Sequence, residues 1–179
     1  MNLHDLPLGY EDPLVAMLVF HRRIERQLAT LGALPSRVEA HGVDSQASAD
    51  AAAALEFFSG KLEVHHADED ALMPMLEMRI AGAPEHDEFQ GLRHRLESEH
   101  REMERSWRGL RRPLEAIAEG LHRRVPLDLV QYFRGIHATH ISLEEAGLHQ
   151  KAARRLLPGD RAALGRGMAA RRTRKFRFQ

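Results

Sequence analysis

The chain has 179 residues, enough for one domain with a sizeable hydrophobic core. Basic and acidic residues number 26 each, so the zero net charge gives no general attraction to nucleic acid or an anionic membrane. The absence of cysteine excludes disulfides, iron–sulfur clusters and thiol catalysis. The N-terminus MNLHDLPLGYEDP lacks a signal-peptide pattern, and no segment approaches the ~20 apolar residues of a membrane span. We therefore expect a cytoplasmic protein.

The first predicted helix begins at Pro13 and carries an apolar stripe at steps of three and four residues. Gly32 is expected to follow its end. Residues 35–48, rich in small and polar side chains, are predicted to form a linker. The second helix is predicted to begin near Ser48 or Asp50, and Pro74 is expected to kink or end it.

The third predicted helix carries an apolar stripe from Leu92 to Leu121. The fourth follows Pro126 and is expected to stop at Pro158. Asp160 can then cap a short fifth helix that runs to about Arg172, within the start of the basic tail RRTRKFRFQ.

The chain contains no convincing strand pattern, so its fold class is predicted to be all-α. Long amphipathic helices with short connections favour an antiparallel up-down four-helix bundle, over about residues 12–157. A short C-terminal helix and the basic tail occupy 158–179, within a single domain of residues 1–179.

Four of the 12 histidines lie one on each long helix, at stripe positions where leucine is expected. They are His21, His65, His100 and His140. Burying an imidazole among aliphatic groups costs free energy unless its nitrogens find partners. A shared metal site gives all four a common partner, because neutral imidazole binds iron, zinc and copper well.

Each of these histidines has a glutamate four residues later, on the same side of its helix. Glu69 lies on its stripe and Glu144 lies close to its own, whereas Glu25 and Glu104 sit beside core positions. Because four imidazoles and two carboxylates exceed one tetrahedral shell, and a carboxylate can bridge two cations, a pair of ions is predicted. The predicted metal ligands are His21, His65, Glu69, His100, His140 and Glu144, with Glu25, Glu104 and His137 as further candidates.

The remaining histidines are interpreted differently. His137 also faces inward, three residues before His140, and is either an extra ligand or a hydrogen-bonded core histidine. His66 lies off its stripe and is expected outside the ligand set. The others are expected at the surface: His4, His41, His86, His94, His122 and His149.

The pattern His21, His65-x3-Glu69, His100 and His140-x3-Glu144 resembles the haemerythrin-like, HHE cation-binding family. The surrounding segments HHADEDALMPML and HATHISLEEAGL fit too, and the likeness runs from about Asp12 to Leu157. The resemblance implies a non-haem di-iron centre (Fe2+/Fe3+) with an open position for dioxygen. Glu69 and Glu144 would bridge the irons and the four histidines would be terminal ligands.

The chain departs from the oxygen carriers of that family at two places. His100-x3-Glu104 stands where they have two histidines. The fourth helix offers Glu144 at i+4 from His140, with Glu145 at the i+5 spacing of their carboxylate. A changed ligand set changes redox behaviour.

The first functional hypothesis is a di-iron protein that binds or senses dioxygen or nitric oxide. The second is a di-iron enzyme that reduces peroxide or nitric oxide, or oxidises ferrous iron. The third is a structural metal-binding bundle, and zinc or manganese remain alternative ions. A ferritin-like set, Glu63-x2-His66 with Glu97-x2-His100, is a weaker alternative because Glu63 and His66 lie off the stripe. The expected binding partner is a small diatomic ligand (O2 or NO) or peroxide. Binding to a membrane or to nucleic acid is not expected, and no protein partner is assigned to the basic tail.

Overall fold

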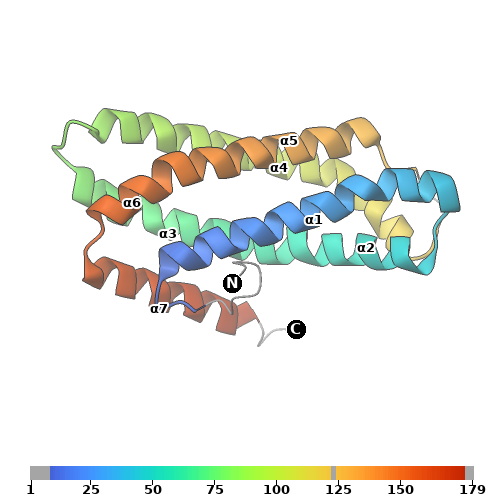
Figure 1. Ribbon diagram of the computed structural model, residues 1–179, viewed down its shortest axis with the longest axis horizontal. Helices are drawn as coiled ribbons and strands as arrows, with labels where there is room; N and C mark the ends of the chain where they lie inside the picture. The colour runs from blue at the N-terminus through green and yellow to red at the C-terminus, as the bar shows by residue number, and fades with distance from the viewer. Residues whose placement is uncertain (1–8, 122–123, 176–179) are drawn as a thin grey trace. The chain divides into compact units, whose positions relative to one another are not determined.

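A computed structural model describes residues 9–121 and 124–175, and all of its regular elements within these ranges are helical. They are α1 (Pro13–His41), α2 (Ser45–Glu56), the π-helical η2 (Phe57–Lys61), α3 (Leu62–Ile80), α4 (His86–Ala118), α5 (Leu127–Leu143), the π-helical η3 (Glu144–His149), α6 (Gln150–Arg155) and α7 (Pro158–Lys175) (Figure 1). The π segments continue the flanking helices without a break. The predicted all-α, helical-bundle class is therefore confirmed.

The first helix is longer than its sequence signals predicted. Gly32 does not end α1, which continues through Pro35 to His41. A Cβ atom at Gly32 would lie 2.7 Å from Nη1 of Arg134, so the missing side chain makes room for that guanidinium group. The glycine that follows the actual end is Gly42, whose φ of +72° is a left-handed conformation that glycine adopts without strain.

The predicted linker over residues 35–48 was wrong, because α2 already begins at Ser45. The Asp44 side chain accepts a hydrogen bond from the Ala47 amide at 2.7 Å, which caps the helix. It also forms an ion pair with Arg37, with 2.7 Å between Nη2 and Oδ2. These two contacts fix the turn between α1 and α2 to three residues.

Later boundaries also shift. Pro74 lies inside α3 and does not end it. The helix before Pro158 ends at Arg155, and Asp160 accepts a hydrogen bond from the Leu157 amide at 2.9 Å at the start of α7. The last helix, α7, spans Pro158–Lys175, so it begins just before Asp160 and runs slightly beyond the end predicted near Arg172, into the basic tail.

The chain divides into two compact units. Unit 1 comprises Met1–Arg23, Glu63–Leu96 and Ile141–Gln179. Unit 2 comprises Ile24–Leu62 and Glu97–His140. The single-domain assignment stays a prediction.

Unit 1 is built around a hydrophobic core to which segments of α1, α3, α4, α6 and α7 contribute, for example Met17, Leu76, Phe89, Ala152 and Leu164. All five side chains are at most 1 % exposed. Burial of this kind is the main source of stability for an amphipathic helix. It fixes the rotation of α1 and α3 about their axes, and so the direction of the polar residues on the same faces.

Unit 2 has an aromatic core. The ring centroid of Phe58 lies 5.2 Å from the ring centroid of Trp107 and 5.1 Å from that of Phe133, distances typical of favourable aromatic pairs. The Trp107 indole N–H donates a hydrogen bond to Ser59 Oγ at 3.1 Å. None of the described helices is long and apolar enough to cross a membrane.

Candidate metal centre

Four buried side chains of unit 1 form a cluster of metal-ligand type. His21 comes from α1, His65 and Glu69 from α3, and Glu144 from the first position of η3. Each offers one ligand atom, and these atoms all lie within 4.8 Å of one another. Nε2 of His65 lies 2.6 Å from Oε1 of Glu69, and Nε2 of His21 lies 3.2 Å from Oε2 of Glu144. The structure thus brings together four of the six predicted ligands, whose binding of a metal stays a prediction.

His21 is held by carboxylates on both of its nitrogens. Nδ1 lies 3.0 Å from Oε1 of Glu145, while Nε2 faces Glu144. Glu145 also forms an ion pair with Arg22, and the hydrogen bond to His21 lowers the pKa of Glu145. A carboxylate on one imidazole nitrogen fixes the ring orientation and leaves the other nitrogen for a metal. The residue at the i+5 spacing from His140 is therefore placed to orient a histidine.

The charge state of His21 depends on its carboxylate neighbours. Burial alone would lower its pKa, but hydrogen bonds to Glu144 and Glu145 raise the pKa to about 9. Without a metal, the imidazole is therefore protonated at neutral pH and occupies the cluster as a cation. A metal ion would take the place of that proton, because only neutral imidazole can ligate.

The expectation that His149 lies at the surface was wrong. His149 is the last residue of η3 and is 6 % exposed. Its ring centroid lies 5.3 Å from that of His21, and neither of its nitrogens has a hydrogen-bond partner among the described residues. Burial lowers the pKa of His149 to about 4, so the imidazole is neutral at physiological pH. The spacing of five residues between Glu144 and His149 could have indicated that His149 faces inward. It does so only if this segment is π-helical, because residues five apart do not share a face of an α-helix.

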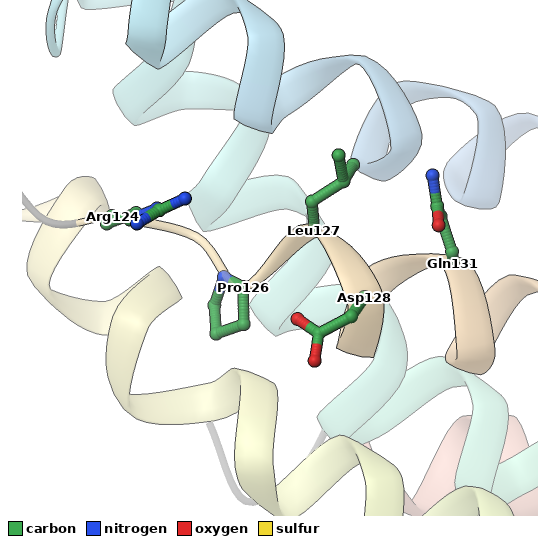
Figure 2. Close-up of a pocket in the computed structure, with 5 residues that line it drawn as sticks. All are labelled: Arg124, Pro126, Leu127, Asp128 and Gln131. Atoms are coloured by element: carbon green, nitrogen blue, oxygen red, sulfur yellow. The ribbon is translucent and has the colours of Figure 1, made fainter.

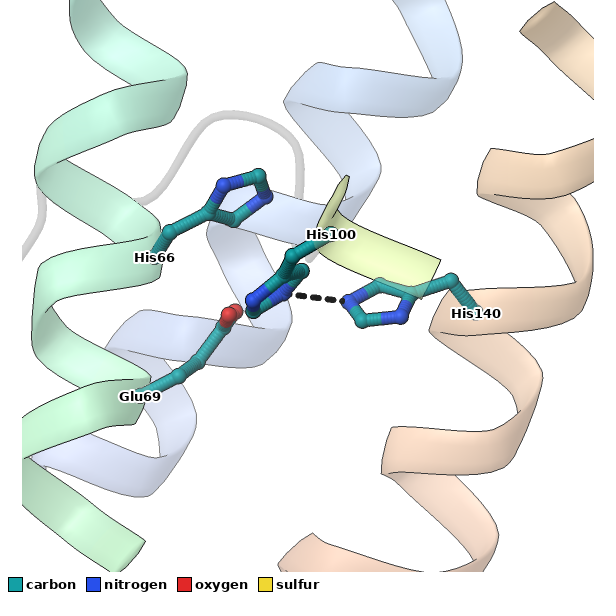
Figure 3. A group of neighbouring side chains, drawn as sticks. All are labelled: His66, Glu69, His100 and His140. Carbon is teal, nitrogen blue, oxygen red and sulfur yellow. Dashed lines mark hydrogen bonds between the residues drawn. The ribbon is translucent and has the colours of Figure 1, made fainter. Parts of the chain in front are cut away.

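In unit 2, His100 from α4 and His140 from α5 lie side by side. Their Nε2 atoms are 3.0 Å apart, as the dashed line in Figure 3 shows. Nδ1 of His140 lies 3.1 Å from Oε2 of Glu99, a second carboxylate–histidine pair. In the neutral tautomer whose Nδ1–H donates to Glu99, His140 has a lone pair on Nε2. Figure 3 also draws His66 and Glu69, both from α3.

The further candidates fall into two groups. His137 is buried, its Nδ1 lies 2.8 Å from the Phe133 carbonyl oxygen, and burial lowers its pKa to about 4. Its Nε2 has no hydrogen-bond partner among the described residues, so the two roles predicted for it, extra ligand and hydrogen-bonded core histidine, both stay predictions. The side chains of Glu25 and Glu104 are exposed.

Among the other histidines, His41 and His94 are exposed as predicted, and His66 and His86 are half-buried. The remaining two predicted surface histidines, His4 and His122, lie outside the described residues.

The first two arginines of the basic tail form ion pairs with a buried carboxylate of unit 1. Asp68, fully buried beside Glu69 on α3, pairs with Arg171 at 2.6 Å and with Arg172 at 2.7 Å, both from α7. Ion pairs that neutralise a buried carboxylate are costly to break. Sequence reasoning treated this segment as a tail, because nothing local indicates a partner 103 residues away.

An open pocket in unit 2, with a volume of about 580 Å³, is lined by Arg124, Pro126, Leu127, Asp128 and Gln131 (Figure 2). Among the described residues, its lining offers one carboxylate and no histidine. It therefore lacks a ligand set for a transition metal.

Comparison with known families matches residues 12–152 to the hemerythrin HHE cation binding domain. A comparison with curated proteins finds no significant match. The chain therefore belongs to the haemerythrin HHE family, a family of cation-binding domains.

The unit 1 cluster fits a bound cation. Its donor set, two imidazoles and two carboxylates, suits iron, zinc or manganese. His65 Nδ1 has no hydrogen-bond partner among the described residues, and its ring stacks on Phe20 at 4.5 Å between centroids. Nε2 of His65, which faces Glu69, also has no hydrogen-bond partner there, and a cation held with Glu69 would supply one.

Proposed function

We propose that the protein holds two iron ions at these histidines and carboxylates and binds or senses dioxygen or nitric oxide there. The observation that carries the proposal is the buried cluster of His21, His65, Glu69 and Glu144. Two carboxylates balance the charge of a divalent cation, so such a site can be buried without an excess positive charge.

The roles of the donors are those that the family likeness implies. His21, His65, His100 and His140 would be terminal nitrogen ligands, and Glu69 and Glu144 would be the carboxylates shared by the two ions. When bound, ferrous iron supplies an open coordination position and electrons for a small ligand. The chain itself contributes orientation, through Glu145 on His21 and Glu99 on His140.

Metal stoichiometry tests the proposal first. Anaerobic loading with ferrous iron should saturate at about two ions per chain, because six inward ligands include two bridging carboxylates. The His94→Ala variant changes an exposed histidine and should load like the unaltered protein, whereas His65→Ala should not. Saturation at one ion would overturn the dinuclear assignment, and the same assay with zinc and manganese reports metal preference.

The functional class is tested by stopped-flow mixing of the iron-loaded, reduced protein with oxygen, nitric oxide or peroxide. A stable adduct with oxygen or nitric oxide that is reversed by removing the gas supports binding or sensing. Rapid multiple turnover of peroxide without such an adduct would instead identify an enzyme.

A further inference from the structure

His149 occupies the same helix face as Glu144 because of the local helix type. Glu144 is the first and His149 the last residue of η3. In a π-helix the hydrogen bonds run from i to i+5, so residues five apart stack on one face. In an α-helix this face would be shared by residues three and four apart instead. Single π turns inside α-helices occur frequently at functional sites.

The environment of His149 is that of a residue whose partner is a metal ion. Its side chain is more than nine-tenths buried, and both nitrogens lack a hydrogen-bond partner among the described residues. Three other inward histidines each have Nδ1 on an oxygen: His21 on Glu145, His137 on Phe133 and His140 on Glu99. A buried polar group with no partner is rare and calls for one.

The position of the ring agrees with this reading. The centroid of His149 lies 5.3 Å from that of His21, close to the 5.1 Å between His21 and His65, two members of the four-residue cluster. Glu144 and Glu69 are also near enough to act on His149 electrostatically. The imidazole therefore borders the cluster, although His149 is not one of the four residues whose ligand atoms all lie within 4.8 Å of one another.

We propose that His149 is a further nitrogen ligand of the ion held by His21, His65, Glu69 and Glu144. The proposal rests on the metal binding proposed above and adds a residue that neither the His-x3-Glu spacing nor the family resemblance assigns. With three imidazoles and two carboxylates, this ion has five protein donors. A six-coordinate ion then keeps one position open for an exogenous ligand.

The test compares Co2+ binding to the full chain with two substitutions, His149→Leu and the surface control His94→Ala. His149→Leu should weaken binding of the tighter ion by at least the about 10–100-fold that loss of an outer-shell partner costs, and should change the visible absorption of the bound Co2+. The metal-free variant should melt at the same temperature as the unaltered protein or higher, because two buried polar atoms without partners have been removed. If the role of His149 were purely structural, its replacement by leucine would lower the melting temperature of both the metal-free and the metal-bound protein.

Equal Co2+ affinity and an equal spectrum in His149→Leu and the unaltered protein would overturn the assignment of His149 alone. Failure of the unaltered protein to bind Co2+ would overturn the proposed metal function as well. In case His149→Leu does not fold, the 15N resonances of the histidine side chains can be followed in the unaltered protein during Zn2+ loading. A large change at one His149 nitrogen is expected, and its absence would refute ligation.

Discussion

Glu145 accepts a hydrogen bond from His21, with 3.0 Å between Oε1 and Nδ1. The contact joins residues 124 positions apart and turns the other nitrogen of His21 toward Glu144. Glu145 therefore acts through His21, as a positioning residue, and its loss should differ in kind from the loss of a ligand.

The first prediction concerns Glu145. Glu145→Ala should retain both ions but lower metal affinity about 10–100-fold, because His21 loses its orienting partner. Glu145→Gln should recover most of the affinity, since its amide oxygen can still accept the bond from Nδ1. Metal titration with a competing chelator measures both. Complete loss of one ion in Glu145→Ala would show that Glu145 is itself a ligand.

The second prediction separates bridging from terminal ligands. A bridging carboxylate touches both ions and offsets their repulsion, so Glu69→Ala and Glu144→Ala should each lose one ion or both. His21→Ala removes a single nitrogen, which water can replace. Both ions should therefore remain bound, but with lower affinity. Metal content per chain and the visible spectrum report these outcomes.

Glu25→Ala is the matched control, because Glu25 also follows a histidine by four residues but has an exposed side chain. It should bind metal as the unaltered protein does. If Glu25→Ala emptied the site while Glu69→Ala left it intact, the assignment of the bridging carboxylates would be wrong.

The third prediction concerns the pH dependence of the metal-free protein. The pKa of His137 is lowered by burial to about 4 in the folded state, below the usual 6.5, so the unfolded chain binds the proton more strongly. Stability should therefore fall as pH drops from about 6.5 to about 4, by up to about 3 kcal/mol for this one group. The pKa of His149 is lowered in the same way and adds to the effect.

His21 acts in the opposite direction. Its folded pKa of about 9 lies above 6.5, so its contribution is complete below pH 6.5 and is lost as pH rises through 9. Urea unfolding of the chelator-treated protein should thus show greatest stability near pH 6.5. His137→Leu should reduce the loss on the acid side. An unchanged acid slope in that variant would contradict the buried, neutral state of His137.

The fourth prediction tests how α7 packs in unit 1. A Cβ atom at Gly165 would lie 2.1 Å from the backbone oxygen of Tyr10, a contact that side-chain motion cannot relieve. Gly165→Ala should therefore destabilise the protein by about 1–3 kcal/mol, the usual range for overpacking. Gly159→Ala, in the same helix with no atom within 4 Å of a Cβ, should be neutral or slightly stabilising. Similar melting temperatures for the two variants would contradict the close approach of α7 to Tyr10.

Much of the cluster could be predicted from sequence, because helical geometry is local. His65 and Glu69 lie four residues apart on one apolar stripe, so any α-helix through them directs both to the core. The same stripe logic brought His21 and Glu144 to buried positions. The exposure of Glu25 and Glu104 follows equally from their places beside Ile24 and Met103.

Helix ends were less predictable, because packing overrode local preference. Gly32 and Pro35 are both helix-breaking signals, yet α1 passes through them. Leu34 and Val38 are buried on either side of Pro35, and Arg134 fills the space at Gly32. Burial of these side chains stabilises a helix that its own propensity would end.

The sequence by itself determined the all-α class, the long helices and the faces on which imidazoles and carboxylates lie, since each depends on residues a few positions apart. Only the tertiary structure decided that residues 144–149 are π-helical, which brings His149 to the face of Glu144. It also decided that Glu145 orients His21 and that Arg171 and Arg172 neutralise Asp68. Such pairings depend on contacts between residues more than 100 positions apart, and no local pattern encodes which distant side chain will meet a buried charge or ring nitrogen.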